Sequence, residues 1–201
     1  MSLPKRFLGY FIQTLNAELG QDTLRIILLK AGLAVGLADP EPAFRLDADS
    51  ATQAYASIQA ALRSHFGRGS RGILTRIGRL IWPLLLAEAS LFLQARMRVL
   101  RALPFPMRTK PTLVFLAGFL SGESNHITVH SLDLEWMFVD NDFAALQPNI
   151  ENESVCYVTL GLIKESLFWA TGCEFDVVET SCRAVDGDAC EFHVKSGLGI
   201  S

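Results

Sequence analysis

The chain has 201 residues with a formal net charge of −3, and half of its residues are apolar. This length and composition suffice for a substantial core and indicate one domain over residues 1–201. The pI of about 5.8 and the lack of a groove-reading motif argue against a nucleic-acid partner. The longest apolar stretch, Leu80 to Leu93, contains Pro83 and Glu88 and is too short to span a bilayer, so no membrane span is expected.

The first 120 residues show apolar side chains at three- and four-residue intervals, which is typical of helices. Asp39-Pro-Glu-Pro42 reads as a loop, and Ser50 can cap the helix that follows it. Pro111 suits the first position of a short helix. Helices are therefore expected over 4–19, 22–31 and 50–66, in more than one piece over 70–103, and from 111 to 118 or 122.

Strands dominate the remainder of the chain. Apolar and polar side chains alternate from Leu132 to Val139, which predicts the clearest strand. A helix from Cys156 to Ala170, closed by Gly172, leads into a hairpin over 173–194 that turns at Asp186-Gly187. Helices followed by strands indicate the α+β class, with helices packed on an antiparallel sheet of about four strands that includes 127–130.

The charge is unevenly distributed along the sequence. Residues 1–120 contain 15 Lys and Arg against 7 Asp and Glu, whereas residues 121–201 contain 3 against 14. Several arginines surround Gly67-Arg-Gly-Ser-Arg-Gly72, and one interpretation is an anion site at the helix that starts after Ser70. A solvated face or a partner surface is favoured, because this loop lacks the Gly-Lys-Ser/Thr ending of a phosphate-binding loop.

Three cysteines and one glutamate form the most informative pattern. If the hairpin loop has three residues, Cys182 and Cys190 lie directly opposite each other, at a separation that two thiolates on one tetrahedral zinc ion can span. Cys156 and Glu179 can then complete a closed, structural shell of four ligands. A disulfide and inert buried cysteines are the alternatives. The sequence up to Leu19 does not read as a signal peptide, so we expect reduced thiols and a cytoplasmic protein.

Cys156, Glu179-Thr-Ser-Cys182 and Gly187-Asp-Ala-Cys190-Glu-Phe192 together resemble the C-terminal signature of the 4-vinyl reductase-like domain family. That family includes the bacteriochlorophyll 4-vinyl reductase group and the sensor domain of phenol- and toluene-responsive sigma-54 activators. In the sensor members the matching residues bind a structural zinc beside an aromatic-ligand pocket. The resemblance therefore implies a zinc-binding segment at 156–194, a fold shared with ligand-binding and transport-particle subunits, and a homodimer.

A ligand pocket is expected where aromatic side chains flank this segment. The sensor relatives seat their ligand with a histidine and a tryptophan, for which His126, His130 and Trp136 are candidate counterparts. An ordinary structural role is the alternative for each of them, and Cys173 stays outside the quartet. The predicted pocket residues are Phe115, Phe119, His126, His130, Trp136, Phe138, Tyr157 and Trp169.

These features lead us to expect a non-enzymatic, zinc-stabilised binding domain for a small hydrophobic molecule, either an aromatic compound or a tetrapyrrole intermediate. It would be sensory or accessory and would act through a separate effector protein. No Gly-x-Gly-x-x-Gly follows a strand, so the sequence gives no support to a dinucleotide-dependent reductase. The alternatives are a protein-interaction adaptor resembling transport-particle subunits, and an accessory factor or enzyme of bacteriochlorophyll synthesis.

Overall fold

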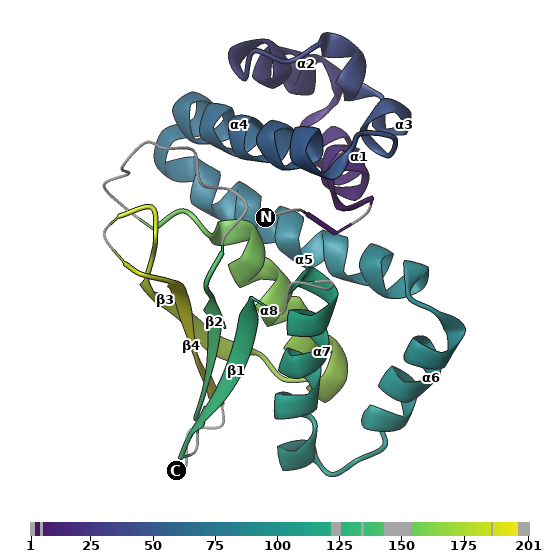
Figure 1. Cartoon of the computed structure of the whole chain (residues 1–201), viewed down its shortest axis with the longest axis vertical. Helices are drawn as coiled ribbons and strands as arrows, with labels where there is room; N and C mark the ends of the chain where they lie inside the picture. Colours follow the sequence, from purple (N-terminus) through teal and green to yellow (C-terminus); the bar gives the residue numbers. More distant parts are fainter. Residues whose placement is uncertain are drawn as a thin grey trace.

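The computed structural model describes residues 3–4, 6–121, 126–133, 135–142, 154–185 and 187–196. The chain forms helices first and strands later (Figure 1). The helical part contains α1 Phe7–Leu19, α2 Gln21–Lys30, α3 Pro40–Ala43, α4 Ala48–Phe66, α5 Ser70–Glu88, α6 Leu91–Leu100 and α7 Thr109–Ser121, with short 3-10 turns η1 Val35–Ala38, η2 Gly67–Gly69 and η3 Phe105–Met107. The remaining elements are β1 Ile127–Leu132, β2 Glu135–Asp140, α8 Tyr157–Thr171, β3 Phe175–Ser181 and β4 Cys190–Ser196.

Two aspartates determine where α3 and α4 begin. The Asp39 carboxylate accepts a hydrogen bond from the Glu41 amide, and Pro40 occupies the first helical position. The predicted loop over 39–42 therefore contains a short helix. Asp47, rather than the predicted Ser50, caps α4, because the Asp47 carboxylate accepts a hydrogen bond from the Ser50 amide. Both differences arise because an aspartate upstream of the expected boundary satisfies the first free amides of the helix.

The apolar stretch predicted as several helices folds as α5 and α6. Pro83 lies inside α5, and the chain turns after Glu88. Ser90 then caps α6, with its hydroxyl accepting a hydrogen bond from the Leu93 amide. In Figure 1, α6 stands at the outer side of the molecule. This position leaves Phe92 78% exposed to solvent.

The sheet has the strand order β1-β2-β4-β3, and every neighbouring pair is antiparallel. Asp133 has a φ of 49°, a left-handed conformation that aspartate tolerates better than most residues. The chain turns there, so β1 ends at Leu132 and β2 begins at Glu135. The strands predicted over 127–130 and from Leu132 to Val139 are therefore both present, but the turn between them lies at Asp133, so Leu132 belongs to β1 and the second strand starts later than predicted.

Two glycines allow α8 to pack directly against α5. A Cβ atom on Gly78 of α5 would overlap the carbonyl oxygen of Val158, and a Cβ on Gly161 of α8 would overlap the carbonyl oxygen of Thr75. The two backbones are therefore in contact where the helices cross. Figure 1 shows α8 lying between α5 and the sheet.

One apolar cluster joins the helices and the sheet. It includes Phe11 of α1 and Ile77 of α5 together with Phe138 of β2 and Phe192 of β4, all of which are fully buried. Helices packed on a four-stranded antiparallel sheet confirm the predicted α+β class. Among the described residues, no helix is long and apolar enough to cross a bilayer.

Candidate metal centre

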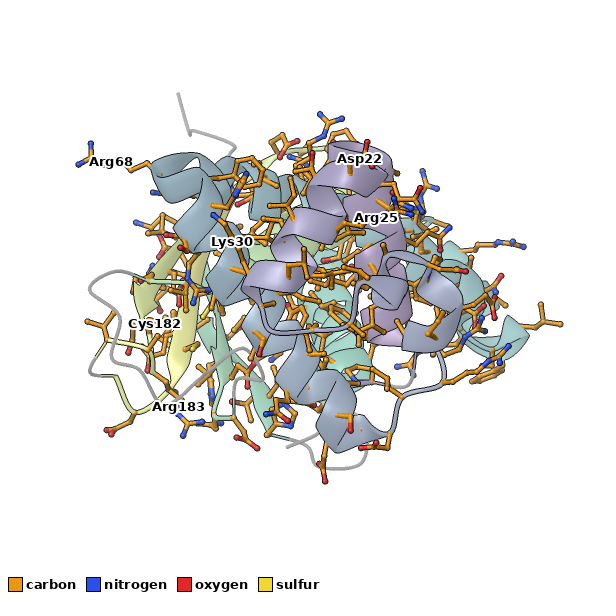
Figure 2. All side chains as sticks on the ribbon, turned by 90° about the horizontal axis from the view of Figure 1, so that it is seen from above. Asp22, Arg25, Lys30, Arg68, Cys182 and Arg183 are labelled. Carbon is orange, nitrogen blue, oxygen red and sulfur yellow. The ribbon has the colours of Figure 1, made fainter. Side chains whose placement is uncertain are left out.

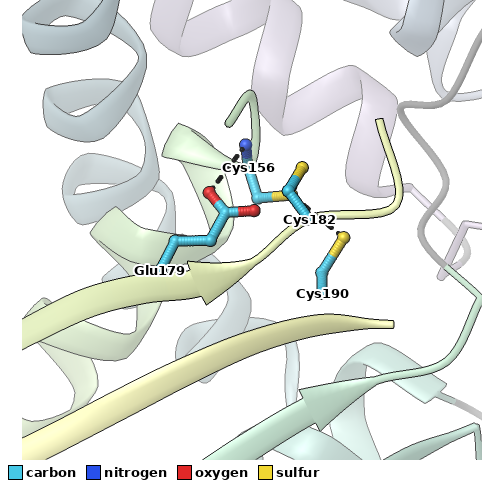
Figure 3. A group of neighbouring side chains, drawn as sticks. All are labelled: Cys156, Glu179, Cys182 and Cys190. Carbon is cyan, nitrogen blue, oxygen red and sulfur yellow. Dashed lines mark hydrogen bonds between the residues drawn. The ribbon is translucent and has the colours of Figure 1, made fainter. Parts of the chain in front are cut away.

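Cys156, Glu179, Cys182 and Cys190 come together at one end of the sheet (Figure 3). Cys156 lies at the N-cap of α8, and Glu179 lies on β3. Cys182 follows the last residue of β3, and Cys190 is the first residue of β4. The four potential ligand atoms all lie within 4.8 Å of one another. The structure therefore brings together all four side chains that the sequence singled out.

The sulfur atoms are closely spaced but are not bonded to one another. Cys156 Sγ lies 3.2 Å from Cys190 Sγ and 3.7 Å from Cys182 Sγ. A disulfide would require about 2.05 Å, so the disulfide alternative does not describe this arrangement. The Glu179 Oε2 atom accepts a hydrogen bond of 3.3 Å from the Cys156 amide, which aligns the carboxylate beside the thiols.

The loop between Cys182 and Cys190 is held by its own hydrogen bonds. The amides of Val185 and Gly187 both donate to the Cys182 carbonyl oxygen. The Ser181 hydroxyl donates to the Ala189 carbonyl oxygen at 3.0 Å. These bonds direct the chain from β3 back into β4, and the last paired residues of the two strands are Ser181 of β3 and Glu191 of β4. Cys182 and Cys190 are thus the next residues beyond the last paired position, close to the directly opposite placement that was predicted.

Burial and the close contacts among the four side chains shift the pKa values of the thiols and of Glu179. Burial raises the pKa of the Cys156 thiol, and burial also raises the pKa of Glu179 to about 8. Hydrogen bonds from the Cys156 and Cys190 thiols lower the pKa of Cys182. The Glu179 Oε1 atom is buried and has no hydrogen-bond partner among the described residues. A buried carboxylate oxygen without a partner is costly, and a cation among the thiols would remove that cost.

Sequence reasoning missed one acidic side chain beside this site. Asp140 is the last residue of β2, is 3% exposed, and pairs with Cys190 in the ladder. Its Oδ1 atom lies 3.6 Å from His126 Nε2, and burial raises the pKa of Asp140. The feature of the sequence that could have identified Asp140 is its position directly after the apolar run Trp136 to Val139.

The predicted pocket residues are dispersed over the molecule. Phe115 and Phe119 share a cavity between α6 and α7, of about 470 Å³. Phe138 is fully buried against Phe192, and Trp169 packs against Trp82. The other predicted pocket residues also lie apart: His126 is beside Asp140, His130 is hydrogen-bonded to Thr128, Trp136 is half-buried on β2, and Tyr157 is under the Arg71 guanidinium.

The remaining cysteine lies away from the cluster. Cys173 is a half-buried free thiol in the turn after α8. Its amide donates a hydrogen bond of 3.2 Å to the Thr171 hydroxyl, which holds the turn in place. Cys173 therefore provides a matched control for the cysteines of the centre.

No family model and no curated protein matches this chain. Solved structures do share its fold. A mutant H-NOX protein from K. algicida, described as Fe(II) unliganded, matches with a TM-score of 0.62 and 11% identity over 98% of both chains. The H-NOX protein from S. oneidensis in the Fe(II)NO ligation state matches with a TM-score of 0.58 and 12% identity, over 94% of this chain and 98% of that chain.

These matches show that the chain has the fold of H-NOX proteins. They correct the assignment to the 4-vinyl reductase-like family, which rested on the C-terminal cysteine pattern alone. The structural zinc cofactor, expected from the spacing of the cysteines and from that family, and the zinc-stabilised binding function are also wrong, because the matching structures are described by iron states and not by zinc. The adaptor and the bacteriochlorophyll alternatives are not favoured by these matches either.

Proposed function

We propose that this chain is a sensor domain of the H-NOX fold whose chemical centre is a metal ion held by Cys156, Cys182, Cys190 and Glu179. The observation that carries this proposal is the convergence of four ligand atoms within 4.8 Å, one of them on the half-buried Glu179, whose Oε1 atom is buried and has no partner among the described residues. Thiolates select thiophilic transition metals over magnesium or calcium. The identity of the metal is left to measurement.

The ion would connect the start of α8 to the hairpin that follows the helix. Cys156 starts α8, whereas the other three ligands belong to β3, β4 and the loop between them. Four protein ligands leave no position for an activated water in a tetrahedral shell, so this centre would not be hydrolytic. We propose that residues 1–201 act as one domain around it.

The H-NOX neighbours are described in iron and nitric oxide states, which raises the question of a heme in this chain. A heme supplies an iron that binds diatomic gases, and proteins hold it through His, Cys, Tyr or Met. Three cavities of about 790, 470 and 410 Å³ are formed by described residues. None of the three is lined by a His, Cys or Tyr, and Met97 is the one thioether that borders any of them.

Three histidines have polar neighbours: His126 lies beside Asp140, His130 bonds Thr128 and His193 lies beside Glu135. The ring of His65 packs against Phe66, and its buried Nδ1 atom has no hydrogen-bond partner among the described residues. A single thioether in an apolar cavity is a poor substitute for an imidazole or a thiolate. None of these three cavities offers an imidazole, thiolate or phenolate to a heme iron, so the proposal does not place a heme in them.

Metal analysis tests the centre directly. The protein is purified under reducing conditions, and all first-row transition metals are quantified by inductively coupled plasma mass spectrometry. We expect one metal ion per chain in the parent protein and in the Cys173→Ser control, and a loss of metal in Cys182→Ser and Cys190→Ser. Reloading the stripped protein with Co(II) should give thiolate-to-cobalt charge-transfer absorption that the two variants lack.

A metal-free parent with no cobalt absorption would contradict the proposed centre, as would a Cys182→Ser variant that keeps the full absorption. Incubation with hemin provides the second readout. We expect no stoichiometric, saturable Soret band, and such a band together with a metal-free cysteine cluster would favour a heme sensor instead.

The homodimer, the separate effector protein and the cytoplasmic location stay predictions. The exposed side of α6 offers an apolar surface, because Leu91 is 83% exposed and Val99 is 66% exposed. Light scattering coupled to size-exclusion chromatography tests the dimer. Phe92→Ser should shift the parent toward the monomer if α6 forms the contact, and an unchanged mass would place the contact elsewhere.

A further inference from the structure

A cationic groove lies between α5 and α8, apart from the metal centre. It has a volume of about 790 Å³ and is open to solvent. Its walls carry Arg68, Arg71, Arg76 and Arg79 from η2 and α5, and Lys164 from α8. The arginines recur at intervals of three to five residues, and all four border the groove.

The groove follows from the glycine crossing described above. Gly78 and Gly161 bring the two backbones into contact, and the helices diverge from that point. Long cationic side chains flank the space that opens. Leu80, Pro83 and Leu160 supply an apolar wall within the same groove.

Two of these cations are neutralised by carboxylates. Arg76 forms an ion pair with Glu18. Arg79 binds Glu165 at 2.8 Å and Glu174 at 2.6 Å. These pairs lie along the middle of α5, between Arg71 and the apolar residues Leu80 and Pro83, and they hold the guanidinium groups in place.

The other three cations have no carboxylate partner within the described part of the chain. Arg71 lies over the Tyr157 ring with its guanidinium carbon 5.9 Å from the ring centroid. Arg68 projects outward from the molecule at the α4–α5 junction (Figure 2). Lys164 borders the groove from α8. The positive end of α5, which begins at Ser70, adds to the potential at this end of the groove.

We propose that this groove binds a small molecule that carries a phosphate or diphosphate group on an apolar body. The guanidinium forks of Arg68 and Arg71 and the ammonium group of Lys164 would bind the phosphate oxygens. The apolar body would lie along Leu80, Pro83 and Leu160. A free nucleotide and a phospholipid headgroup share this chemistry, and the test separates them.

Isothermal titration calorimetry of the reduced protein as purified is performed with inorganic pyrophosphate and with adenosine triphosphate. The test variant is Arg68→Ala/Arg71→Ala/Lys164→Ala. The matched control, Lys30→Ala/Arg98→Ala/Lys110→Ala, removes the same charge from exposed positions outside the groove. Loss of a charge-assisted hydrogen bond weakens binding by about tenfold or more, so we expect at least that loss in the test variant and less than about a twofold change in the control.

Vesicles of phosphatidylcholine with and without phosphatidic acid form the second arm. Saturable binding of the soluble probes without vesicle binding supports a free phosphorylated ligand, and groove-dependent binding to the phosphatidic acid vesicles alone supports a lipid headgroup. Absence of binding in both arms overturns the proposal, and so does an equal loss in the test and control variants. A single Arg68→Glu variant, at an exposed position where folding should be unaffected, should also bind the probes more weakly than the parent. This outcome is independent of metal content, so it fails or succeeds separately from the proposed metal centre.

Discussion

Replacing Gly78 by alanine should destabilise the protein through one steric contact. The added Cβ would overlap the carbonyl oxygen of Val158 and would lie 3.0 Å from the Cα atom of Gly161. Both neighbours belong to the backbone of α8, so no side-chain rotation can relieve the overlap, and the two helices must separate.

The magnitude follows from two opposing effects. Alanine in place of glycine inside a helix gains up to about 1 kcal/mol. Overpacking costs about 1–3 kcal/mol and more where the neighbour cannot move. We expect a net loss of about 2 kcal/mol or more, which corresponds to a fall in Tm of about 4–8 °C in a chain of this size.

Gly118 of α7 gives the matched control. It also lies inside a helix, but a Cβ atom added there would meet no other atom within 4 Å, so Gly118→Ala should stabilise the protein by about 0.5–1 kcal/mol. Urea unfolding followed by circular dichroism measures both variants. Equal changes of the same sign in Gly78→Ala and Gly118→Ala would refute the backbone contact between α5 and α8.

Three further predictions test the centre, the core and the ion pairs. In the metal-stripped protein, the raised pKa of Glu179 means that the folded state keeps a proton that the unfolded state has lost, so stability should fall as pH rises from about 4.5 to 8. The urea midpoints at pH 5 and pH 8 should therefore differ less in Glu179→Gln than in the parent. The same difference in both proteins would contradict this. Phe138→Ala should cost about 3–5 kcal/mol in urea unfolding, because the ring is fully buried against Phe192, whereas Val178→Ala at a 48% exposed position should change stability by less than about 0.5 kcal/mol. Arg79→Met should cost about 1 kcal/mol or less, and thermal melts in high salt should show the difference shrinking, since its ion pairs are partly exposed.

Removal of the metal extends these tests. A ligand present at about a thousandfold excess over its Kd stabilises the folded state by about 4 kcal/mol. A chelator should therefore lower the Tm of the parent and of Cys173→Ser by about 8–16 °C. Cys190→Ser should melt at the lower temperature with or without the chelator, and a chelator effect of the same size in that variant would contradict the assigned ligands.

The parts of the fold that were predictable depend on local signals. Gly172 ends α8 in a left-handed conformation, as its position after Ala170 indicated. The turn at Asp133 was hidden, because the alternation of apolar and polar residues continues through it from β1 into β2. A period of two residues identifies the strands but does not show where the chain reverses.

The centre was predictable for a different reason from the fold family. Thiols and a carboxylate at the ends of a hairpin constrain one another through short-range geometry, so Cys156, Glu179, Cys182 and Cys190 could be grouped from sequence. Their pattern contains no information about how α1 to α7 pack. The likeness to an H-NOX structure extends over 98% of the chain and so includes the helical packing, which no motif in the sequence encodes.

Helix α8 has a consequence for how the molecule can move. It spans 15 residues, about 22 Å, with Cys156 at its start and Lys164 along its length. Since backbone meets backbone at the crossing with α5, neither helix can slide past the other there without the two separating. The sulfur cluster at the start of α8 and the groove along its length are therefore positioned by the same helix, whose place on α5 is set by that crossing.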